Sequence, residues 1–429
     1  SLNSGSPAYT IHRRIYREKS FSGVEGQFNL NDNLYTDTLF MVDEASMIAN
    51  MGLGGMSFGS GCLLDDLVHF VYQGRNDRLL LIGDKAQLPP VGEEESPALH
   101  AAMLEGYGLK VYECDLNEVL RQSEESGILY NATMIRQMIT HDDITQLPKI
   151  HFAGYSDIKP MPGAELIEAL ADSYHHVGLD DTIVVTRSNK RANIFNQGIR
   201  NMVLDREEEL SQGDILMIVK NNYYWMEEER KKIKEKEIEE RRVKSEGTES
   251  GTATHKVQSS KFQVQSNDIP AFLANGDRAK VLKVRRRIDL YGFRFATLLL
   301  QFPDYGNYEL EATVLLDTLT SEAPALTHEQ QEQLFHQIEE DYQDIPLKAD
   351  RMKAIRQDQF FNALQVKFAY AVTCHKAQGG QWAHVYVDQG YMTDDMLNPD
   401  YIHWLYTAFT RATEMLYLVN WPETQTALE

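Results

Sequence analysis

The sequence predicts an α/β fold in which a small β-barrel interrupts the second of two α/β units. The first observation is length, since 429 residues suit two or three domains that each bury a core of their own. The second is a series of continuous apolar runs that alternate with longer helical segments, a pattern typical of buried parallel strands. The third is a middle region of short strands and turn residues, which indicates a small barrel.

Five apolar runs predict the parallel strands. Each run is short and ends in a polar loop, and the segments between the runs can hold helices. The runs are residues 39–42, 79–82, 183–185, 385–387 and 415–419.

The middle of the chain predicts the barrel and its additions. Short strands are predicted at residues 214–219, 279–284, 295–302 and 308–316, with turns at Asn275-Gly276 and at residues 305–307. Residues 227–260 form a charged linker: the Glu/Lys/Arg run 227–244 predicts a solvated helix, and the Gly/Ser/Thr-rich stretch that follows predicts a flexible loop. Residues 327–360 are rich in Glu, Gln and Lys and predict a helical pair.

Composition restricts the class of protein. Apolar residues make up 42% and charged residues 25%, and no stretch approaches the roughly 18 apolar residues of a membrane span. The net charge of −22 argues against a general nucleic-acid coat protein, although a motor needs only a locally basic groove. The three cysteines show no metal-ligand spacing. We therefore expect reduced thiols and a cytoplasmic protein without membrane contact.

Asp43 and Glu44 give the strongest early chemical signal because they directly follow the first apolar run. The carboxyl ends of strands are where α/β folds bind ligands. Asp43 suits Mg²⁺, which prefers oxygen ligands and phosphate oxygens, and Glu44 suits a base that orients or deprotonates a water molecule. The alternative is a pair of acids that stabilises the start of a helix.

A second signal follows about 40 residues later. The run 79–82 ends in a Gly83-Asp84 turn, which leads to Gln87 and the pair Pro89-Pro90. Gln87 is a neutral donor and acceptor that suits a γ-phosphate sensor, and the two prolines stiffen the exit from the turn.

These segments resemble motifs II and III of superfamily 1B DNA helicases of the RecD-like (exodeoxyribonuclease V alpha-subunit-like) and Dda-like kind. The matching strings are VDEASM at 42–47 and GDKAQLPPVG at 83–92. Further segments resemble the remaining family motifs in the family's order. They are residues 7–16, 116–122, 184–196, 274–281, 368–382 and 405–419.

The resemblance implies two RecA-like P-loop NTPase domains, with an SH3-like β-barrel inserted in the second. We expect the first domain at residues 1–175, the second at 176–212 and 362–429, and the insertion at 213–361.

The resemblance also implies ATP and Mg²⁺ as cofactors. Arg121 and Arg411 would approach the γ-phosphate as transition-state arginines, together with Glu44 and Gln87 as catalytic residues. Gly379 and Gln381 would lie at the nucleotide. The family usually has an acidic residue where this chain has Gln381, which puts the strength of that contact in doubt.

Single-stranded DNA is the partner that the resemblance implies, with duplex junctions as the site of unwinding. Thr373, His375, Lys376 and Gln378 lie in the motif V-like segment beside two glycines that let a backbone approach closely. His12 and Thr186 are further candidates for DNA contact, from the segments that resemble the region after motif Ia and the entry to the second domain.

One family motif is missing from the sequence. A P-loop (Walker A) reads Gly-x-x-x-x-Gly-Lys-Ser/Thr, and no such string occurs in these residues. Since the family places this loop before the 7–16 segment, we expect that the chain is a truncated form and that it does not hydrolyse ATP efficiently alone.

Three functions stay open at this point. The first is an ATP-dependent 5′→3′ DNA helicase or translocase in DNA repair or recombination, alone or with exonuclease-complex subunits. The second is a module that binds single-stranded DNA or a partner without hydrolysing ATP. The third is an RNA-directed superfamily 1 helicase, because the sequence carries no clear signal for or against a 2′-hydroxyl.

Overall fold

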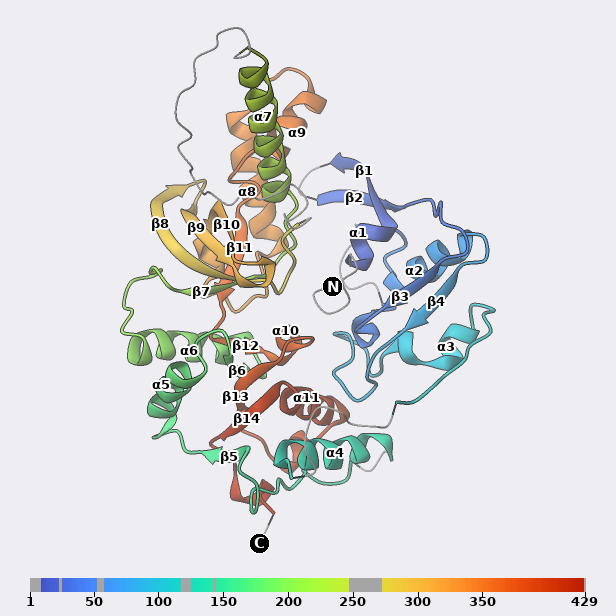
Figure 1. The fold of residues 1–429 in the computed structure, drawn as a ribbon, viewed down its shortest axis with the longest axis vertical. Helices are drawn as coiled ribbons and strands as arrows, with labels where there is room; N and C mark the ends of the chain where they lie inside the picture. Colours follow the sequence, from blue (N-terminus) through green and yellow to red (C-terminus); the bar gives the residue numbers. More distant parts are fainter. Residues whose placement is uncertain are drawn as a thin grey trace. The chain divides into compact units, whose positions relative to one another are not determined.

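The computed structural model describes residues 9–22, 25–51, 58–116, 125–141, 144–246 and 272–427 (Figure 1). The chain divides into two compact units. The first unit comprises residues 1–203 and 370–429, and the second comprises residues 204–369. No helix among the described residues combines the length and the apolar character needed to cross a bilayer.

The N-terminal part of the first unit holds two small sheets. One is antiparallel and the other is parallel, and each has two strands. The elements of this part are α1 (Ile11–Ile15), β1 (Tyr16–Ser22), β2 (Glu25–Leu30), β3 (Leu39–Val42), α2 (Leu63–Gln73), β4 (Arg78–Leu81) and α3 (Ala101–Glu105). Strands β3 and β4 form the parallel pair, so their carboxyl ends meet at one edge.

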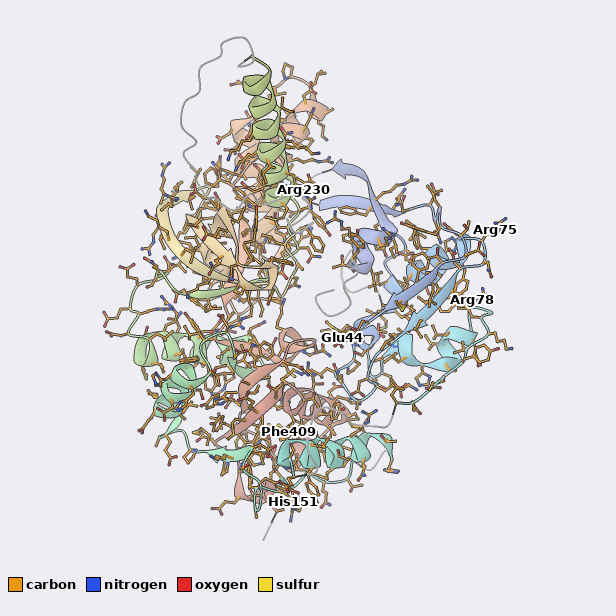
Figure 2. The ribbon with its side chains drawn as sticks, in the orientation of Figure 1. Glu44, Arg75, Arg78, His151, Arg230 and Phe409 are labelled. Atoms are coloured by element: carbon orange, nitrogen blue, oxygen red, sulfur yellow. The ribbon has the colours of Figure 1, made fainter. Side chains whose placement is uncertain are left out.

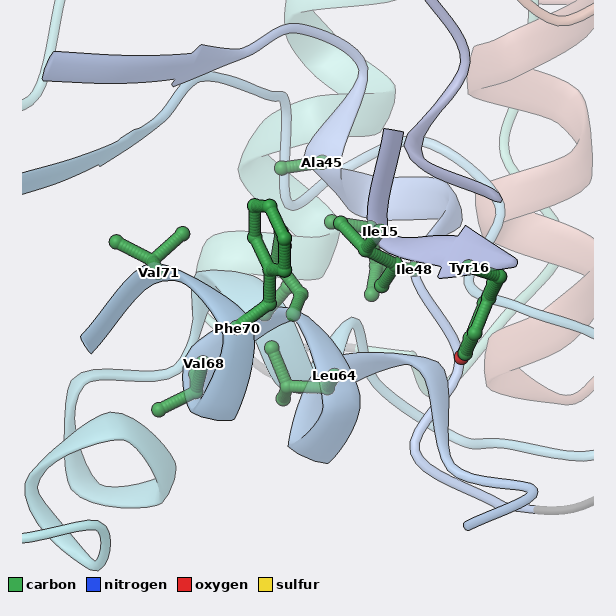
Figure 3. Packing of buried hydrophobic residues seen from close by; sticks show 10 residues of the cluster. Ile15, Tyr16, Ala45, Ile48, Leu64, Val68, Phe70 and Val71 are labelled. Atoms are coloured by element: carbon green, nitrogen blue, oxygen red, sulfur yellow. The ribbon is translucent and has the colours of Figure 1, made fainter. Parts of the chain in front are cut away.

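Helix α2 provides the core of this part. Leu64, Leu67, Val68 and Val71 recur at helical spacing and are all buried, so one stripe of the helix faces the sheet. Figure 3 shows these side chains packed with Phe70 and with residues of α1. The opposite face of β3 is open among the described residues, where Leu39 and Met41 are 54% and 69% exposed. The predicted strands are therefore present, but only one face of this sheet is covered.

A parallel five-stranded sheet forms the rest of the first unit, in the order β12-β6-β13-β14-β5. Every residue of β6 is buried, as its continuous apolar run predicted. The elements are α4 (Gly127–Thr140), β5 (Ile158–Met161), α5 (Leu166–His176), β6 (Thr182–Thr186), α6 (Asn189–Gly198), β12 (Ala371–Thr373), α10 (Cys374–Ala377), β13 (Trp382–Asp388), α11 (Pro399–Phe409) and β14 (Ala412–Val419).

The expected domain boundary near residue 175 needs correction. Strand β5 pairs with β14 from Leu416 to Val419, so residues 158–161 lie in the second sheet and not in the first α/β part. Residue 150 pairs with residue 426 in an isolated bridge and supports the same assignment.

The second unit is a closed barrel with helical additions. The barrel order is β10-β11-β7-β8-β9, and the strands are β7 (Ile215–Ile218), β8 (Arg278–Leu290), β9 (Phe293–Phe302), β10 (Tyr308–Leu315) and β11 (Leu364–Phe368). The additions are α7 (Tyr224–Glu246), α8 (His328–Asp341) and α9 (Lys348–Arg356). Gly276, Gly306 and Asn307 have φ values of 105°, 64° and 61°, so the turns lie where the sequence predicted them.

The prediction of an α/β fold with a small inserted barrel is confirmed. The limits 213–361 are too narrow for the insertion, since β11 closes the barrel by pairing with both β7 and β10 and belongs to the unit 204–369. Residues 227–246 of the charged linker are helical, as part of α7, and residues 247–260 lie outside the described residues.

Candidate functional site

Two polar loops meet at the carboxyl edge of the parallel pair β3 and β4. Asp43 and Glu44 follow β3, and Gly83 and Asp84 follow β4 (Glu44 is labelled in Figure 2). The amide of Ile82 donates to Val42 O at 2.8 Å, and the amide of Ala45 donates to Ile82 O at 2.9 Å. These bonds hold the two loops side by side, so the carboxylates of both strands share one edge.

Glu44 has an unusual backbone. Its φ is 52°, in the left-handed region that residues other than glycine rarely adopt, and its amide donates to Asp43 Oδ1 at 2.9 Å. Strained backbone of this kind persists where surrounding structure fixes it, and it occurs often at functional sites. The Glu44 side chain lies near the C-terminal segment, since a Cβ placed on Gly379 would lie 4.0 Å from Glu44 Oε1.

The loop after β4 folds around the Asp84 carboxylate. Asp84 Oδ1 accepts from the amide of Ala86 at 3.0 Å, and Asp84 O accepts from the amide of Gln87 at 3.2 Å. Gln87 is half-buried, and its Oε1 atom is buried without a hydrogen-bond partner in the described structure. Because an unpartnered buried acceptor costs free energy, this atom is poised to accept a hydrogen bond from a bound group.

The loop 84–88 is held by three side chains from two C-terminal segments. Leu88 donates its amide to Thr407 Oγ1 at 2.8 Å, and Leu88 O accepts from Gln378 Nε2 at 2.9 Å. His403 Nδ1 lies 2.9 Å from Ala86 O. Gln378 precedes the two glycines after α10, and the other two side chains project from α11, so residues about 290 to 320 positions apart in sequence meet here.

Asp84 is also bound by two residues that the sequence did not single out. Tyr406 of α11 donates its hydroxyl to Asp84 Oδ2 at 2.7 Å, and Arg136 of α4 lies 3.5 Å from the same oxygen. Arg136 also donates to the Tyr406 hydroxyl at 3.3 Å. Asp84 and Tyr406 lie inside the recognised segments, but no motif marks Arg136, and only the structure shows the three-way contact.

Arg411 follows α11 and is 4% exposed. It donates to Thr407 O and Gly380 O at 2.9 Å each, and to Thr410 Oγ1 at 3.0 Å. Burial lowers the pKa of Arg411, and negative groups that include Glu44 oppose this change. The structure therefore brings Arg411 and Glu44 into one electrostatic neighbourhood, with the guanidinium held by Thr407 and Thr410 of its own segment and by Gly380 of the motif V-like segment.

Residues 368–419 match the family model described as the UvrD-like helicase C-terminal domain. This segment is therefore similar to a UvrD-like helicase C-terminal domain. The segment, called the UvrD-like domain below, spans β12, α10, β13, α11 and β14, and it includes Gln378, Thr407 and Arg411. The match agrees with the predicted resemblance to helicases over these residues, and the RecD-like subgroup stays a prediction.

No curated protein matches the sequence of the chain. Among solved structures, the chain is similar to Pif1 helicase from Candida albicans at 13% identity and a TM-score of 0.42, over 91% of this chain and 73% of that one. It is also similar to Pif1 helicase from Bacteroides in complex with ADP-AlF3 and ssDNA, at 12% identity and a TM-score of 0.41, over 91% and 72% of the two chains. At these scores the likeness carries no weight for function.

The expected DNA-contacting residues of the UvrD-like domain lie around α10. Thr373 ends β12, and His375 and Lys376 are on the helix that follows. His375 is exposed and Thr373 is half-buried. Burial lowers the pKa of Lys376 to about 8. Gln378 differs from these, since its amide nitrogen binds Leu88 O within the protein.

The other two candidates for DNA contact are committed to the protein interior. Thr186 is fully buried, and its hydroxyl donates to Ser188 O at 3.1 Å and Val372 O at 3.3 Å, so a direct contact with DNA is not supported. His12 packs its ring against Phe58 at 5.1 Å and Tyr16 at 5.6 Å between centroids. Burial lowers the pKa of His12, which favours a neutral packing role.

The remaining predicted nucleotide residues divide into three cases. Gly379 has a φ of 76°, which favours glycine, and Gln381 is exposed beside it. Asp43 is exposed at the end of β3. Arg121 lies outside the described residues.

The donor set fits a phosphate-bound cation better than a preformed metal site. Within the described residues no group of three or more His, Cys, Asp or Glu side chains is placed to hold a metal ion. Mg²⁺ in phosphate-transferring sites is commonly held by one or two carboxylates together with phosphate oxygens and water. The exposed carboxylate of Asp43 and the open acceptor of Gln87 are compatible with such an arrangement.

Proposed function

We propose that this chain belongs to an ATP-dependent motor that moves along single-stranded DNA and separates strands. Asp43 would hold Mg²⁺ and Glu44 would accept the proton of the attacking water. Gln87 and Arg411 would respond to the γ-phosphate. When bound, ATP with its Mg²⁺ supplies the phosphoryl group whose transfer such a motor uses.

One observation carries this proposal, which is that four motif-like segments, residues 42–47, 83–92, 368–382 and 405–419, contact one another in the first unit. The Glu44 side chain faces Gly379. The side chains of Gln378 and Thr407 bind the backbone of Leu88, and Arg411 binds the carbonyl of the same Thr407. A nucleotide at Glu44 and DNA at α10 would therefore act on one connected set of backbone segments. Such a connection is what coupling between hydrolysis and DNA movement requires.

Finer features of the proposal follow from the family resemblance alone. They are 5′→3′ polarity, action at duplex junctions in repair or recombination, association with exonuclease-complex subunits, and a cytoplasmic location. Arg121 belongs to the same group, as a second transition-state arginine.

The first test is DNA binding by the 429-residue chain, measured by fluorescence anisotropy with a labelled single strand. We expect binding that weakens as salt rises, since phosphate contacts release counterions. Lys376→Gln should weaken binding severalfold, whereas Lys190→Gln, which changes an exposed lysine on α6 of the same unit, should not. Equal affinity of both variants and the unchanged chain would remove Lys376 from the DNA path.

A second candidate function is supported by the sequence, which holds no Gly-x-x-x-x-Gly-Lys-Ser/Thr string. That loop supplies backbone amides and a lysine to the phosphates. A module that binds single-stranded DNA or a partner without hydrolysis is therefore the alternative, and an RNA-directed helicase is the third possibility.

ATP hydrolysis and strand competition separate these functions. We expect the 429-residue chain to show no DNA-stimulated hydrolysis at an ordinary helicase rate. If hydrolysis is found, Glu44→Gln should abolish it while nucleotide binding persists. Unlabelled RNA of the same sequence should compete less well than DNA, and stronger competition by RNA would favour the RNA-directed alternative.

A further inference from the structure

The barrel carries a basic strand that the proposed site does not use. Strand β8 contains six basic side chains within residues 278–287, in a chain whose net charge is −22. In its antiparallel register with β9, Lys283 pairs with Leu299 and Arg286 pairs with Thr297. Lys283 and Arg286 are exposed, and their partners are half-buried, so this side of the pair forms the outer surface of the barrel.

Two irregularities in the pairing concentrate this charge. The register shifts between Val281 and Lys283 and again between Val284 and Arg286. Side chains of a regular strand alternate between faces, but bulges re-aim them. As a result, residues 285, 286 and 287 are three consecutive arginines that are all exposed.

An acidic segment, residues 205–212, lies beside this strand. It is anchored at Leu210, which is fully buried and whose carbonyl accepts from Arg287 NH2 at 2.8 Å. Arg206 also binds the buried Asp214 at 2.9 Å. The anchors fix the backbone of the segment, while Glu207 and Glu208 remain exposed.

Acidic side chains of this segment neutralise part of the basic surface. Glu208 lies 3.4 Å from Arg287, and Glu209 forms an ion pair with Arg294 of β9. The Arg287 and Glu208 side chains are 43% and 73% exposed. Ion pairs this exposed contribute little free energy because water and salt screen them, so another anion can replace the carboxylates.

An open cleft separates the acidic segment from the strand. Its volume is about 850 Å³, and Lys283 and Val284 line it together with residues of the segment 205–212. Within the described residues the Lys283 and Arg286 side chains form no ion pair or hydrogen bond, and both are exposed to solvent. Lys283 and the weakly held Glu208 therefore line the same cleft.

We propose that this surface of the barrel binds the sugar-phosphate backbone of DNA, and that Glu208 and Glu209 cover part of it in the free protein. Phosphate offers arginine the same paired oxygens as carboxylate, so it can displace both glutamates. The choice of DNA rests on the proposed function.

The surface fits backbone contacts and not base stacking. Stacking needs exposed aromatic rings, and the large hydrophobic side chains exposed in the described part of this unit are Tyr223, Ile238 and Leu347, none of them in β8, β9 or the acidic segment. Backbone contacts are independent of sequence and sensitive to salt. We therefore expect this surface to add affinity without base preference.

The first arm of the test removes the basic groups from the full chain. Lys283→Gln with Arg286→Gln should weaken binding of a labelled single strand severalfold. The slope of log affinity against log salt should fall in magnitude by about 1 to 2, as expected for the loss of two phosphate contacts. The matched control is Lys348→Gln with Lys353→Gln, two exposed lysines on α9, which should leave affinity and slope nearly unchanged.

The second arm removes the acidic cover. Glu208→Gln with Glu209→Gln should strengthen binding severalfold, whereas Glu329→Gln with Glu340→Gln on α8 changes the net charge equally and should strengthen it much less. Equal gains in the two acidic double variants would overturn the role of the cover. An unchanged affinity and salt slope in the Lys283 and Arg286 variant would overturn the binding surface itself.

Failure of this inference differs from failure of the proposed function. If Lys376→Gln weakens binding and the β8 variant does not, DNA binds at α10 and the barrel surface is not used. If the chain does not bind DNA at all, both proposals fail together. If only the β8 variant weakens binding, the barrel proposal stands and the α10 path is lost.

Discussion

Thr407 links the loop 84–88 to Arg411 through two of its own atoms. Its hydroxyl oxygen accepts from the Leu88 amide at 2.8 Å, and its carbonyl accepts from Arg411 Nε at 2.9 Å. The residue is fully buried, so neither bond competes with water. A shift of the loop 84–88 would therefore be transmitted to Arg411 through a single residue. Thr407 is thus a direct link between this loop and the segment that holds Arg411.

Replacing Thr407 by valine should lower stability. Valine keeps the shape but leaves the buried Leu88 amide without an acceptor, which costs about 1–3 kcal/mol. Thr407→Ser keeps the hydroxyl and loses only a methyl group, so the Leu88 bond should persist. Amide hydrogen exchange at Leu88 checks the prediction directly: it should speed up in the valine variant and stay slow in the serine variant. Equal exchange in both would show that the bond does not matter.

Lys376 predicts a pH dependence of DNA binding. Burial lowers its pKa to about 8, so the ammonium is present below that pH and is lost as pH rises through it. Because phosphate binds the charged form, affinity for a single strand should fall between pH 7 and pH 9, both values being about one unit from the pKa. Lys376→Arg keeps its charge throughout and should flatten the profile. A slope retained in the arginine variant would place the titrating group elsewhere.

Motif residues were predictable from the sequence because their chemistry is local to strand ends. Asp43 and Glu44 directly follow one apolar run, Gln87 lies in the loop after the next, and the structure places both loops at one edge of the β3–β4 pair. Arg136 was not predictable, since it stands in an ordinary amphipathic helix and gains its role only by meeting Asp84 in space. Thr186 lies in a motif-like segment and was predicted to contact DNA. The motif did not reveal that its hydroxyl donates a hydrogen bond to Val372 O inside the protein.

At the scale of elements, the loop between β2 and β3 depends on a glycine. Asn33 Nδ2 donates to Asp77 Oδ2 at 2.9 Å, and Asp77 Oδ1 accepts from the Thr38 amide at 2.9 Å. Gly74 ends α2 beside them, where an added Cβ would lie 2.0 Å from Asp77 Oδ2. The absence of a side chain at this position leaves room for the network that sets the entry into β3.

Gly74→Ala should therefore destabilise the chain. The φ of Gly74 is −75°, which alanine adopts readily, so the cost is steric, about 1–3 kcal/mol. Gly198→Ala is the control, because its Cβ would have no neighbour within 4 Å at the end of α6. That change should be neutral or stabilising by up to about 1 kcal/mol. Urea unfolding of both variants measures the difference, and similar midpoints would contradict the steric account.

Continuous apolar strands were predicted well, and interrupted ones were not. Strands β3, β4 and β6 lie within about one residue of their predicted limits. Strand β5 was missed because it is short and contains Pro160, which a sheet tolerates at an edge, and β5 is an edge strand. Its absence from the prediction explains why the boundary near residue 175 was wrong.

At the scale of the molecule, the positions of the charged groups and the connections between distant segments matter more for the proposed function than the overall composition does. The net charge of −22 opposes nucleic acid at long range, yet basic groups gather at α10 and along β8. The site at Glu44 is built from segments more than 300 residues apart, so it exists only when the first unit is folded. The UvrD-like domain by itself supplies only one side of this site.

Photochemical crosslinking of a thymidine-containing single strand to the whole chain, with the attached peptides identified by mass spectrometry, tests whether single-stranded DNA binds at α10. We expect attachment to peptides that contain residues 371–381, and its loss when an excess of unlabelled single strand is added. Saturated binding with no attachment to that segment, and attachment only elsewhere on the chain, would contradict it.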